Sequence, residues 1–411
     1  MNANHRNALA AIALLGFVQP AAADVIADWN TKAIDFVVAH KMLPPPAERI
    51  VAMAQLAMFD AVNSIDRKYQ PYLTQLPAAP TASKEAAAAA AAGGVLAGVD
   101  PQTEGEVKAT LAAYLAAIPD GAAKTEGMKL GEAVAAKMLQ ARSDDGANAP
   151  DIYRPRTTPG VYVPTVPTAT PQWPHVKPFA LTSGSQFRPP PPIGLTSKEW
   201  ADNYNEIKEL GGRTSAKRSA EQTEKARFWL ATDGRVHYPV IRTIVADKEL
   251  SLIDSARLFA LIAVARADAL IAVFDAKYHY EFWRPVTAIR NGDVDGNPAT
   301  ERDPAWQPID ATPMHPEYPC AHCISSGSLA GVVETVFGTA RISEVSMTSP
   351  TAPGVFHRWT NVRDYSNEVS EARIWAGFHY RFSTKVGQDM GYKIGEYVVK
   401  NFMQPLSMAT R

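Results

Sequence analysis

The feature that most constrains the fold is a long apolar stretch at residues 250–282, in which apolar residues recur at helical spacing. Ala, Leu and Met also recur at helical spacing over residues 25–140, and residues 86–92 are all alanine. Shorter helices are expected after Ser197, which begins a Ser-x-x-Trp start signal, and over residues 223–230. Helical patterning on both sides of the middle of the chain predicts an all-α protein built from helical bundles.

The middle of the chain has a different composition. Residues 151–194 are rich in Pro, Thr and Val and end in four consecutive prolines. Because proline lacks a backbone N–H and clashes with the preceding turn, we predict an extended surface connection here. Two roles stay open for it, a plain linker and a lining for the mouth of a site. The predicted division of the chain is an N-terminal helical half at residues 24–150, a Pro-rich connecting segment at residues 151–195 and a C-terminal helical bundle at residues 196–405.

The first 23 residues have the order of a secretory signal peptide. The basic residue Arg6 is followed by the apolar residues 8–18 and the small residues 21–23. We therefore expect residues 1–23 to be a signal peptide and the mature protein to be periplasmic or secreted. No other run approaches the length of a membrane span, so no integral membrane segment is expected after signal cleavage. A formal charge of −1 gives no reason to expect nucleic acid as a partner.

Three short patches in the last third of the chain combine residues that suit a tetrahedral oxyanion. In the first, Lys277 and Arg284 are seven residues apart, which is two turns of a continuous helix and puts both side chains on one face. Pro285 would end or kink that helix. Lys offers a point charge and Arg a planar fork of donors for the oxygens of phosphate or vanadate. Solvated surface cations are the alternative, but aromatic neighbours such as Trp283 favour an inward-facing strip.

The second patch covers residues 319–322, Pro-Cys-Ala-His, and leads into a helix predicted at residues 325–337. The free N–H groups and the dipole of a helix N-terminus favour an anion, so the backbone N–H near Ala321 would face it. Cys320 comes directly before Ala321, and its thiol is a weaker hydrogen-bond donor than a hydroxyl. His322 is the candidate for moving a proton.

The third patch contains Arg373 and, six residues later, His379. On a continuous helix the two side chains would lie about 120° apart, a gap that the long Arg side chain can bridge. Gly377 would loosen the turn before His379 and let its imidazole point at the anion that Arg373 binds. Taken without the other patches, His379 would be interpreted as a core histidine among aromatic residues.

In this order and spacing, the three patches resemble the superfamily that joins the vanadium-dependent haloperoxidases to the type-2 phosphatidic acid phosphatases. The family pattern is Lys-x6-Arg-Pro, then Pro-Ser-Gly-His, then Ser-Arg-x5-His. Residues 277–290 and the upstream residues 57–63 resemble the bacterial haloperoxidase branch in particular. The resemblance therefore covers most of the chain after residue 23, and it implies helical bundles of the haloperoxidase and acid phosphatase type.

The resemblance also implies roles for the site residues. In a haloperoxidase, His379 would coordinate the vanadium of a vanadate cofactor, and His322 would be the acid–base residue acting on hydrogen peroxide and a halide. In a phosphatase there would be no cofactor, and His379 would attack a phosphate ester as the nucleophile. In both, the oxyanion would be held by Lys277, Arg284, Cys320, Ala321 and Arg373.

Two further residues are candidates for a supporting role beside the anion. By the resemblance, the place of His315 holds Phe in the chloroperoxidase type and His in the bromoperoxidase type, which implies bromide or iodide more than chloride. His315 could equally be a loop residue. Trp283 would pack over the halide position, with core packing as the alternative.

The chain departs from the family pattern at three places. Cys320 replaces Ser, and a thiol beside peroxide is readily oxidised, which favours a phosphatase or a loss of activity. Ala321 replaces Gly, a milder change. Cys320 and Cys323 are the only cysteines, and a local disulfide between them fits an exported protein. Ser383 stands where family members commonly have Asp, so one carboxylate that would orient His379 is missing.

From these residues and the resemblance, we expect an exported vanadium-dependent haloperoxidase-like enzyme. One alternative is a soluble acid phosphatase that acts through a phosphohistidine at the same site. Another is a non-catalytic protein that binds phosphate or vanadate. The sequence leaves the oligomeric state open, with a homo-oligomer among the options.

Overall fold

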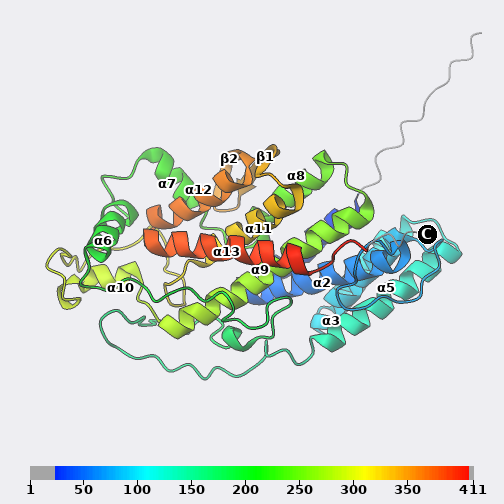
Figure 1. Ribbon diagram of the computed structural model, residues 1–411, viewed down its shortest axis with the longest axis horizontal. Helices are drawn as coiled ribbons and strands as arrows, with labels where there is room; N and C mark the ends of the chain where they lie inside the picture. The colour runs from blue at the N-terminus through cyan, green and yellow to red at the C-terminus, as the bar shows by residue number, and fades with distance from the viewer. Residues whose placement is uncertain (1–23, 407–411) are drawn as a thin grey trace, which may run out of the picture.

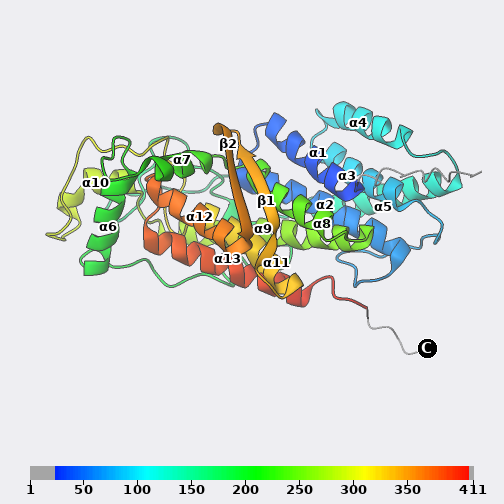
Figure 2. The same cartoon turned by 90° about the horizontal axis from the view of Figure 1, so that it is seen from above.

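The computed structural model describes residues 24–406 and shows a mostly helical, elongated molecule (Figures 1 and 2). Within these residues there are thirteen α-helices, three short 3-10 helices and one two-stranded sheet, which confirms the predicted helical-bundle class. None of the helices between residues 24 and 406 combines the length and apolar character needed to cross a membrane. The predicted signal peptide at residues 1–23 lies outside the described residues.

The elements in chain order are α1 (Val25–Ala39), α2 (Pro44–Asp66), α3 (Lys84–Val99), α4 (Glu104–Ala116), α5 (Ala122–Ala141), η1 (Trp173–His175), α6 (Lys198–Gly211), α7 (Ala220–Phe228), η2 (Gly234–Val236), α8 (Tyr238–Asp247), α9 (Leu252–Tyr280), α10 (Pro285–Arg290), η3 (Gly292–Val294), α11 (Ala321–Phe337), β1 (Arg341–Ser349), β2 (Ala352–Asn361), α12 (Val362–Trp375) and α13 (Arg381–Asn401).

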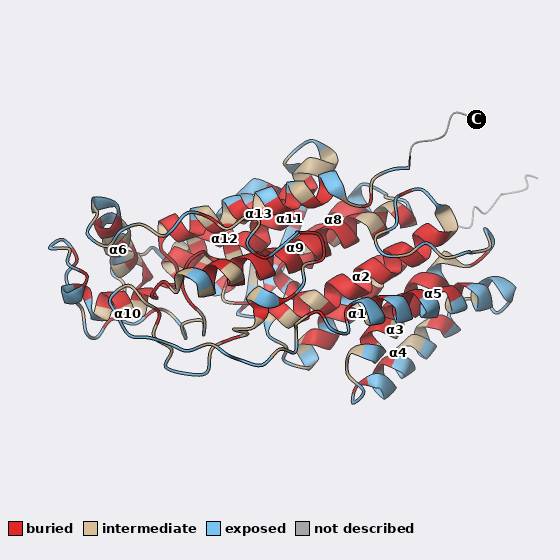
Figure 3. Cartoon of the chain, turned by 60° about the horizontal axis from the view of Figure 1, so that its bottom comes forward, coloured by how far each residue is buried: buried red, intermediate tan, exposed pale blue. Residues whose placement is uncertain are grey.

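Helix α9 lies at the centre of the molecule and is buried along nearly its whole length. It packs against α2 from the N-terminal helices and against α11 and α13 from the C-terminal helices. Figure 3 shows buried residues all along α2 and α9, whereas α4 is largely exposed. A helix that is apolar on all sides must be covered on all sides, and one hydrophobic core accordingly contains residues from both ends of the chain. The predicted division at residues 150 and 195 stays a prediction.

Two helix pairs pack through small residues. In α3, residues 86–92 are all fully buried alanines, and a Cβ at Gly131 of α5 would lie 2.3 Å from the Ala87 carbonyl oxygen. In the other pair, a Cβ at Gly391 of α13 would lie 2.4 Å from the Ile324 carbonyl oxygen of α11. The backbones approach too closely for any side chain at these positions, so glycine sets both helix spacings.

A β-hairpin of strands β1 and β2 was not among the expectations for an all-α chain. The strands pair antiparallel, with Val345 opposite Trp359. Val345, Met347 and Ser349 are buried while the residues between them are exposed, and this period of two is the signal for a half-buried strand. Helix α12 follows directly after β2, so the hairpin leads the chain into the helix that carries Arg373.

The Pro-rich segment at residues 151–195 contains only the three-residue helix η1 and turns, and it follows the edge of the molecule in Figure 1. Backbone N–H groups without a helix or sheet need other acceptors. The buried Asp268 of α9 accepts the N–H groups of residues 179–181 at 2.7, 2.7 and 2.8 Å. Tyr162 also donates its backbone N–H to the Glu281 carbonyl oxygen at 2.6 Å. These bonds attach the segment to the C-terminal helices.

Candidate anion-binding active site

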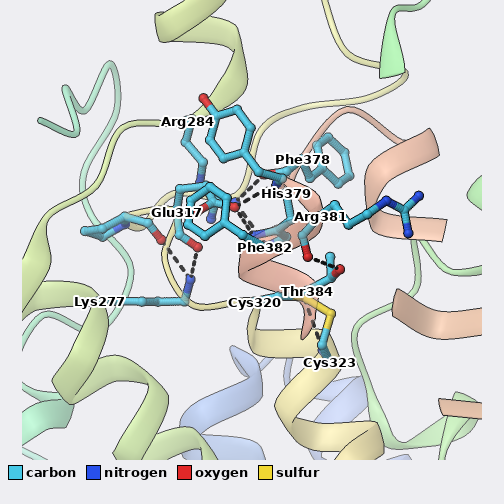
Figure 4. A network of polar contacts seen from close by, with 12 residues as sticks. Lys277, Arg284, Glu317, Cys320, Cys323, Phe378, His379, Arg381, Phe382 and Thr384 are labelled. Atoms are coloured by element: carbon cyan, nitrogen blue, oxygen red, sulfur yellow. Dashed lines mark hydrogen bonds and ion pairs between the residues drawn. A yellow bond between two sulfur atoms is a disulfide. The ribbon is translucent and has the colours of Figure 1, made fainter. Parts of the chain in front are cut away.

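The three sequence patches meet between the end of α9, the start of α11 and the α12–α13 loop (Figure 4). Lys277 lies in the last turn of α9 and is fully buried. Its ammonium group donates hydrogen bonds to the carbonyl oxygens of Pro316 at 2.8 Å and Glu317 at 2.7 Å. Burial lowers the pKa of Lys277 well below its usual range, and the nearby Arg284 lowers it further. Lys277 therefore joins the first patch to the loop that precedes α11.

Arg284 is not on the same helix as Lys277, in contrast to the prediction. Helix α9 ends at Tyr280 because Glu281 adopts a left-handed conformation with φ 48°, and Arg284 is the N-cap residue of α10, which begins with Pro285. Proline at the first position of a helix needs no hydrogen-bonded N–H, so it starts α10 here and does not kink α9. The two cations still converge, because both reach the loop before α11.

The Arg284 guanidinium joins the second and third patches. It donates to the His315 carbonyl oxygen at 2.8 Å and to the Phe378 carbonyl oxygen at 3.0 Å. It also contacts His315 Nδ1 at 3.0 Å and His379 Nε2 at 3.2 Å. Arg284 is 1% exposed, and burial lowers its pKa to about 10.

The carboxylate of Glu317 orients His379, a contact that the sequence reasoning missed. His379 Nδ1 lies 2.8 Å from Glu317 Oε1, which also accepts the backbone N–H of Tyr380 at 3.1 Å. With its Nδ1–H donated to Glu317, His379 has its lone pair on Nε2, which in this structure faces an Arg284 N–H at 3.2 Å and would ligate an anion that replaced this contact. The carboxylate expected to be missing at Ser383 is thus supplied by a different segment. The one sequence feature that could have marked Glu317 is its position between Pro316 and Pro319, at the start of the second patch.

Both members of this pair are fully buried. Burial raises the pKa of Glu317 to about 7, while the positive charges of Lys277 and Arg284 pull it down. Burial lowers the pKa of His379 well below its usual range, and Arg284 and Lys277 add to that shift. A neutral imidazole beside several cations is a suitable ligand or nucleophile, because its free nitrogen is not protonated.

Gly377 makes the turn that brings His379 to the site. Helix α12 ends at Trp375, and Gly377 has φ +80°, a conformation that disfavours other residues. A Cβ at this position would also lie 2.5 Å from the Gly211 carbonyl oxygen of α6. The continuous helix considered for the third patch is therefore absent, and the turn after α12 positions His379.

Arg373, in the last turn of α12, is 1% exposed and has a free donor. One of its terminal N–H groups donates to the Trp229 carbonyl oxygen, and its guanidinium lies 4.8 Å from the centre of the Phe378 ring. Its Nε is buried without a hydrogen-bond partner among the residues that the structure describes. Burial, followed by repulsion from Arg284, lowers the pKa of Arg373 to about 9. A buried unpaired guanidinium donor is costly unless an acceptor meets it.

His322 and Ala321 lie in the first turn of α11, which begins at Ala321 and not at residue 325 as predicted. His322 Nε2 contacts the Ala231 carbonyl oxygen at 3.2 Å. Burial and the charge of Arg373 lower the pKa of His322 well below its usual range. With Nε2–H donated to Ala231, Nδ1 is the nitrogen that remains to accept a proton.

Cys320 does not have the predicted role of a thiol donor, because it forms a disulfide with Cys323 and carries no S–H. Its sulfur instead accepts the backbone N–H of Cys323 at 3.2 Å and caps α11. A Cβ at Gly387 of α13 would lie 2.6 Å from the Cys320 carbonyl oxygen, so α13 presses directly on this turn. The disulfide also removes the objection that a free thiol would be oxidised beside peroxide.

A cavity of about 330 Å³ opens onto this cluster. Of the predicted residues, it is lined by His315, Ala321, His322, Arg373 and His379. Four other predicted residues are buried and are not part of the lining: Lys277, Trp283, Arg284 and Cys320. Ala169 of the Pro-rich segment also contributes to the wall, in line with one of the two roles considered for that segment.

Trp283 takes the core-packing alternative and not a place over a halide. It is 2% exposed and stacks on Trp200 of α6, with ring centres 6.0 Å apart and an interplanar angle of 23°. His315, by contrast, faces the cavity and is held by Arg284. His237 also lines the cavity and was not predicted, since nothing in its sequence neighbourhood marks it.

The residues fit a tetrahedral oxyanion. Lys277, Arg284 and Arg373 are buried cations, and Glu317 is the carboxylate that contacts the cluster through His379. Burying three cations near one carboxylate is unfavourable unless a further anion balances them. The unpaired Arg373 Nε and the lone pair of His379 Nε2 are respectively a donor for an oxyanion oxygen and a ligand for its central atom.

The chain is similar to known proteins in sequence and in fold. Residues 257–407 match the family described as the VCPO second helical-bundle domain. The chain is 27% identical, over 282 residues, to the vanadium chloroperoxidase of Curvularia inaequalis. That alignment covers 52% of this chain and 46% of the relative, so the chain matches about half the length of that protein.

Solved structures share the fold across most of the chain. The first bacterial vanadium-dependent iodoperoxidase superposes with a TM-score of 0.79 at 22% identity, covering 92% of this chain and 96% of that one. A holo-type bacterial vanadium-dependent chloroperoxidase superposes with a TM-score of 0.72 at 19% identity, covering 87% and 92%. At these identities the structural likeness establishes the fold alone.

Proposed function

We propose that this chain, which is similar to vanadium haloperoxidases, is an enzyme that oxidises halide with hydrogen peroxide at a vanadate bound to His379. The observation that carries the proposal is the group of buried cations Lys277, Arg284 and Arg373. His379 contacts Arg284, and His322 lines the same cavity as Arg373. Such a cluster favours an oxyanion over a neutral ligand or a metal cation. Vanadate, when bound, would supply the Lewis acid that activates peroxide.

The residues of the chain have separable tasks in this proposal. Glu317 fixes the ring of His379 through Nδ1, so that Nε2 is presented to the anion. Arg284 and Arg373 supply donors for anion oxygens, and Lys277 adds positive charge from behind the lining. His322, kept neutral by burial, accepts the proton of hydrogen peroxide at Nδ1 and returns it to the leaving oxygen.

The halide and the compartment are part of the proposal. We propose bromide or iodide over chloride, supported by His315 at the cavity wall beside Arg284. We also propose export to the periplasm or beyond, supported by the signal-like residues 1–23 and by the disulfide, which persists in oxidising compartments.

The test is bromination of a phenol-type dye by purified protein with hydrogen peroxide, with and without added orthovanadate. We expect activity that requires vanadate and disappears in His379→Ala. Hydrolysis of p-nitrophenyl phosphate runs beside it without vanadate. Phosphate ester hydrolysis that vanadate inhibits, without halogenation, would replace the proposal with the phosphatase. Phosphate binding without either reaction would leave a non-catalytic anion-binding protein.

A further inference from the structure

The connection between α7 and α8, residues 229–237, touches the site at several points and belongs to none of the three sequence patches. The Trp229 carbonyl oxygen accepts a hydrogen bond from Arg373, and the Ala231 carbonyl oxygen contacts His322 Nε2 at 3.2 Å. Three side chains of the connection line the cavity, namely Leu230, Thr232 and His237. The connection therefore adds a further histidine to the cavity that His322 lines.

The protonation of the His237 ring follows from its contacts. His237 is 2% exposed, and its Nδ1 lies 2.5 Å from the Tyr365 hydroxyl. The Val236 carbonyl oxygen is 3.5 Å from that hydroxyl, so Tyr365 donates to Nδ1. Burial raises the pKa of Tyr365, so the hydroxyl keeps its proton. Burial also lowers the pKa of His237 well below its usual range, and the charge of Arg266 lowers it further. A neutral imidazole that accepts at Nδ1 carries its proton on Nε2.

Aromatic packing holds this ring in place. The Trp229 ring stacks on His237, with ring centres 6.2 Å apart and an interplanar angle of 29°. Tyr365 in turn packs edge-on against Trp229 at 5.6 Å and against Trp359 at 5.5 Å. Within residues 24–406, Nδ1 of His237 has Tyr365 as its partner and Nε2 has no hydrogen-bond partner. The nitrogen left for a molecule in the cavity is therefore Nε2, as a donor.

His237 and His322 offer complementary groups to such a molecule. His322 donates its Nε2–H to Ala231, which leaves Nδ1 as an acceptor, whereas His237 offers an N–H. Hydrogen peroxide can donate one O–H and accept at its other oxygen. A halide ion can only accept, so it can use His237 but not His322. A neutral donor with a neutral acceptor thus suits a small molecule with an O–H group better than a second anion.

We propose that His237 is a further binding residue of the site, which donates its Nε2–H to hydrogen peroxide while the peroxide donates an O–H to His322 Nδ1. The inference rests on the proposed function for the identity of the substrate. His237 keeps its proton throughout, and the proton that peroxide gives up goes to His322. The task of His237 is to hold the peroxide so that this transfer can occur.

The first test is hydrogen peroxide binding to the vanadate-loaded protein without halide, followed by ultraviolet absorbance. His237→Phe keeps a packed ring but has no donor, and we expect peroxide affinity to fall roughly two- to tenfold. His237→Gln, whose side-chain amide carries N–H donors, should bind peroxide more tightly than His237→Phe. His279→Phe is the matched control, since His279 is exposed and is not part of the cavity wall, and it should bind as the parent does.

Two further measurements separate a donor from a structural histidine. Nitrogen-15 NMR of histidine-labelled, vanadate-free protein should show the His237 proton on Nε2, with the signal assigned by its shift in Tyr365→Phe. A proton on Nδ1 would overturn the inference. In turnover, His237→Phe should raise the KM for peroxide and not the KM for bromide. Equal peroxide affinities of His237→Phe and His237→Gln would overturn the donor role, and so would a parallel loss of phosphate affinity in His237→Phe, because the anion site would then be disturbed.

The inference and the proposed function fail in different ways. Vanadate-dependent bromination by the parent, with the same peroxide affinity in the parent and in His237→Phe, would overturn the inference and leave the proposed function standing. Absence of bromination by the parent would remove the proposed function and the inference with it.

Discussion

The α3–α5 pair and the α11–α13 pair are built in the same way and serve different ends. Both use glycine to bring a helix within contact distance of a neighbouring backbone carbonyl, through Gly131 in α5 and Gly391 in α13. Around α3 the close packing buries only alanine and other apolar side chains. Around α11 it fixes a helix N-terminus that carries His322 and the disulfide. The comparison shows that close helix packing stabilises both pairs, but that it positions candidate active-site residues only in the α11–α13 pair.

The matched glycines provide the largest expected effect. Gly131→Ala and Gly391→Ala each place a Cβ within 2.3 or 2.4 Å of a carbonyl oxygen that cannot rotate away. Each should lower the free energy of unfolding by about 3 kcal/mol, measured by denaturant melts. Phosphate affinity, measured by calorimetry, should fall only in Gly391→Ala. Equal affinity losses in the two variants would erase the distinction between the regions.

Glu317→Gln sharpens the comparison inside the site. Glu317 Oε1 accepts both His379 Nδ1–H and the Tyr380 N–H, and a Gln amide oxygen can accept both as well, but it is neutral and therefore forms a weaker hydrogen bond to the imidazole than a carboxylate does. We expect vanadate affinity to fall by about 10- to 100-fold. The melting temperature should change little, because the variant also removes a buried charge. The readouts are vanadium-51 NMR titration and thermal melts. Unchanged affinity would remove Glu317 from its positioning role.

Asp268 is the carboxylate to compare with Glu317, since it holds the Pro-rich segment and touches no site residue. Burial raises its pKa from 3.8 to about 6. Its contribution to stability is therefore fully present below pH 3.8 and is lost as pH rises through about 6. Because Asp60 and Glu317 also have raised pKa values, we expect stability to fall across this window in both proteins, but by on the order of 2 kcal/mol less in Asp268→Asn, whose overall stability is lower. Urea melts at pH 4, 5, 6 and 7 measure it, and parallel curves would contradict it.

The disulfide gives the smallest expected effect. Replacing both cysteines by serine should cost less than about 2 kcal/mol, because the closed loop is very short. The hydroxyl introduced at position 320 would be a donor where the sulfur now has no hydrogen to donate, so the Cys320→Ser, Cys323→Ser protein should bind phosphate somewhat more tightly. The Cys323→Ser single variant, with a free thiol at Cys320, is the control. Weaker phosphate binding in the double variant would count against an anion beside this turn.

Much of the fold was predictable because long helices leave a periodic pattern in the sequence. The stretch at residues 250–282 predicted α9 to within two residues at each end, and Ser197 is the N-cap of α6 as expected. The β-hairpin was missed although residues 345–349 alternate, since the helical pattern elsewhere set the expectation. The bend at Glu281 was missed because a left-handed residue that is not glycine leaves no mark in the sequence.

The residues of the candidate site were predictable where they belong to short sequence motifs. Four of the predicted residues are buried in one region, namely Lys277, Arg284, Arg373 and His379, and the half-buried His322 lines the cavity there. The pairing of Glu317 with His379 joins residues 62 positions apart, and no local pattern reports such a contact. Cys320 was open to two interpretations, since a thiol donor and a disulfide have the same sequence. Only the distance to Cys323 in the fold decides between them.

The burial of α9 has a consequence for modularity. The family match begins at residue 257, inside α9, and runs to residue 407. Yet α9 lies against α2, which is far earlier in the chain, as well as against α11 and α13. The segment at residues 257–407 therefore does not have a core of its own that could be transferred to another protein. In evolution and in protein engineering, exchanges between relatives should succeed when α2 and α9 are inherited together, and splicing at the match boundary should yield chimaeras with a mismatched central interface.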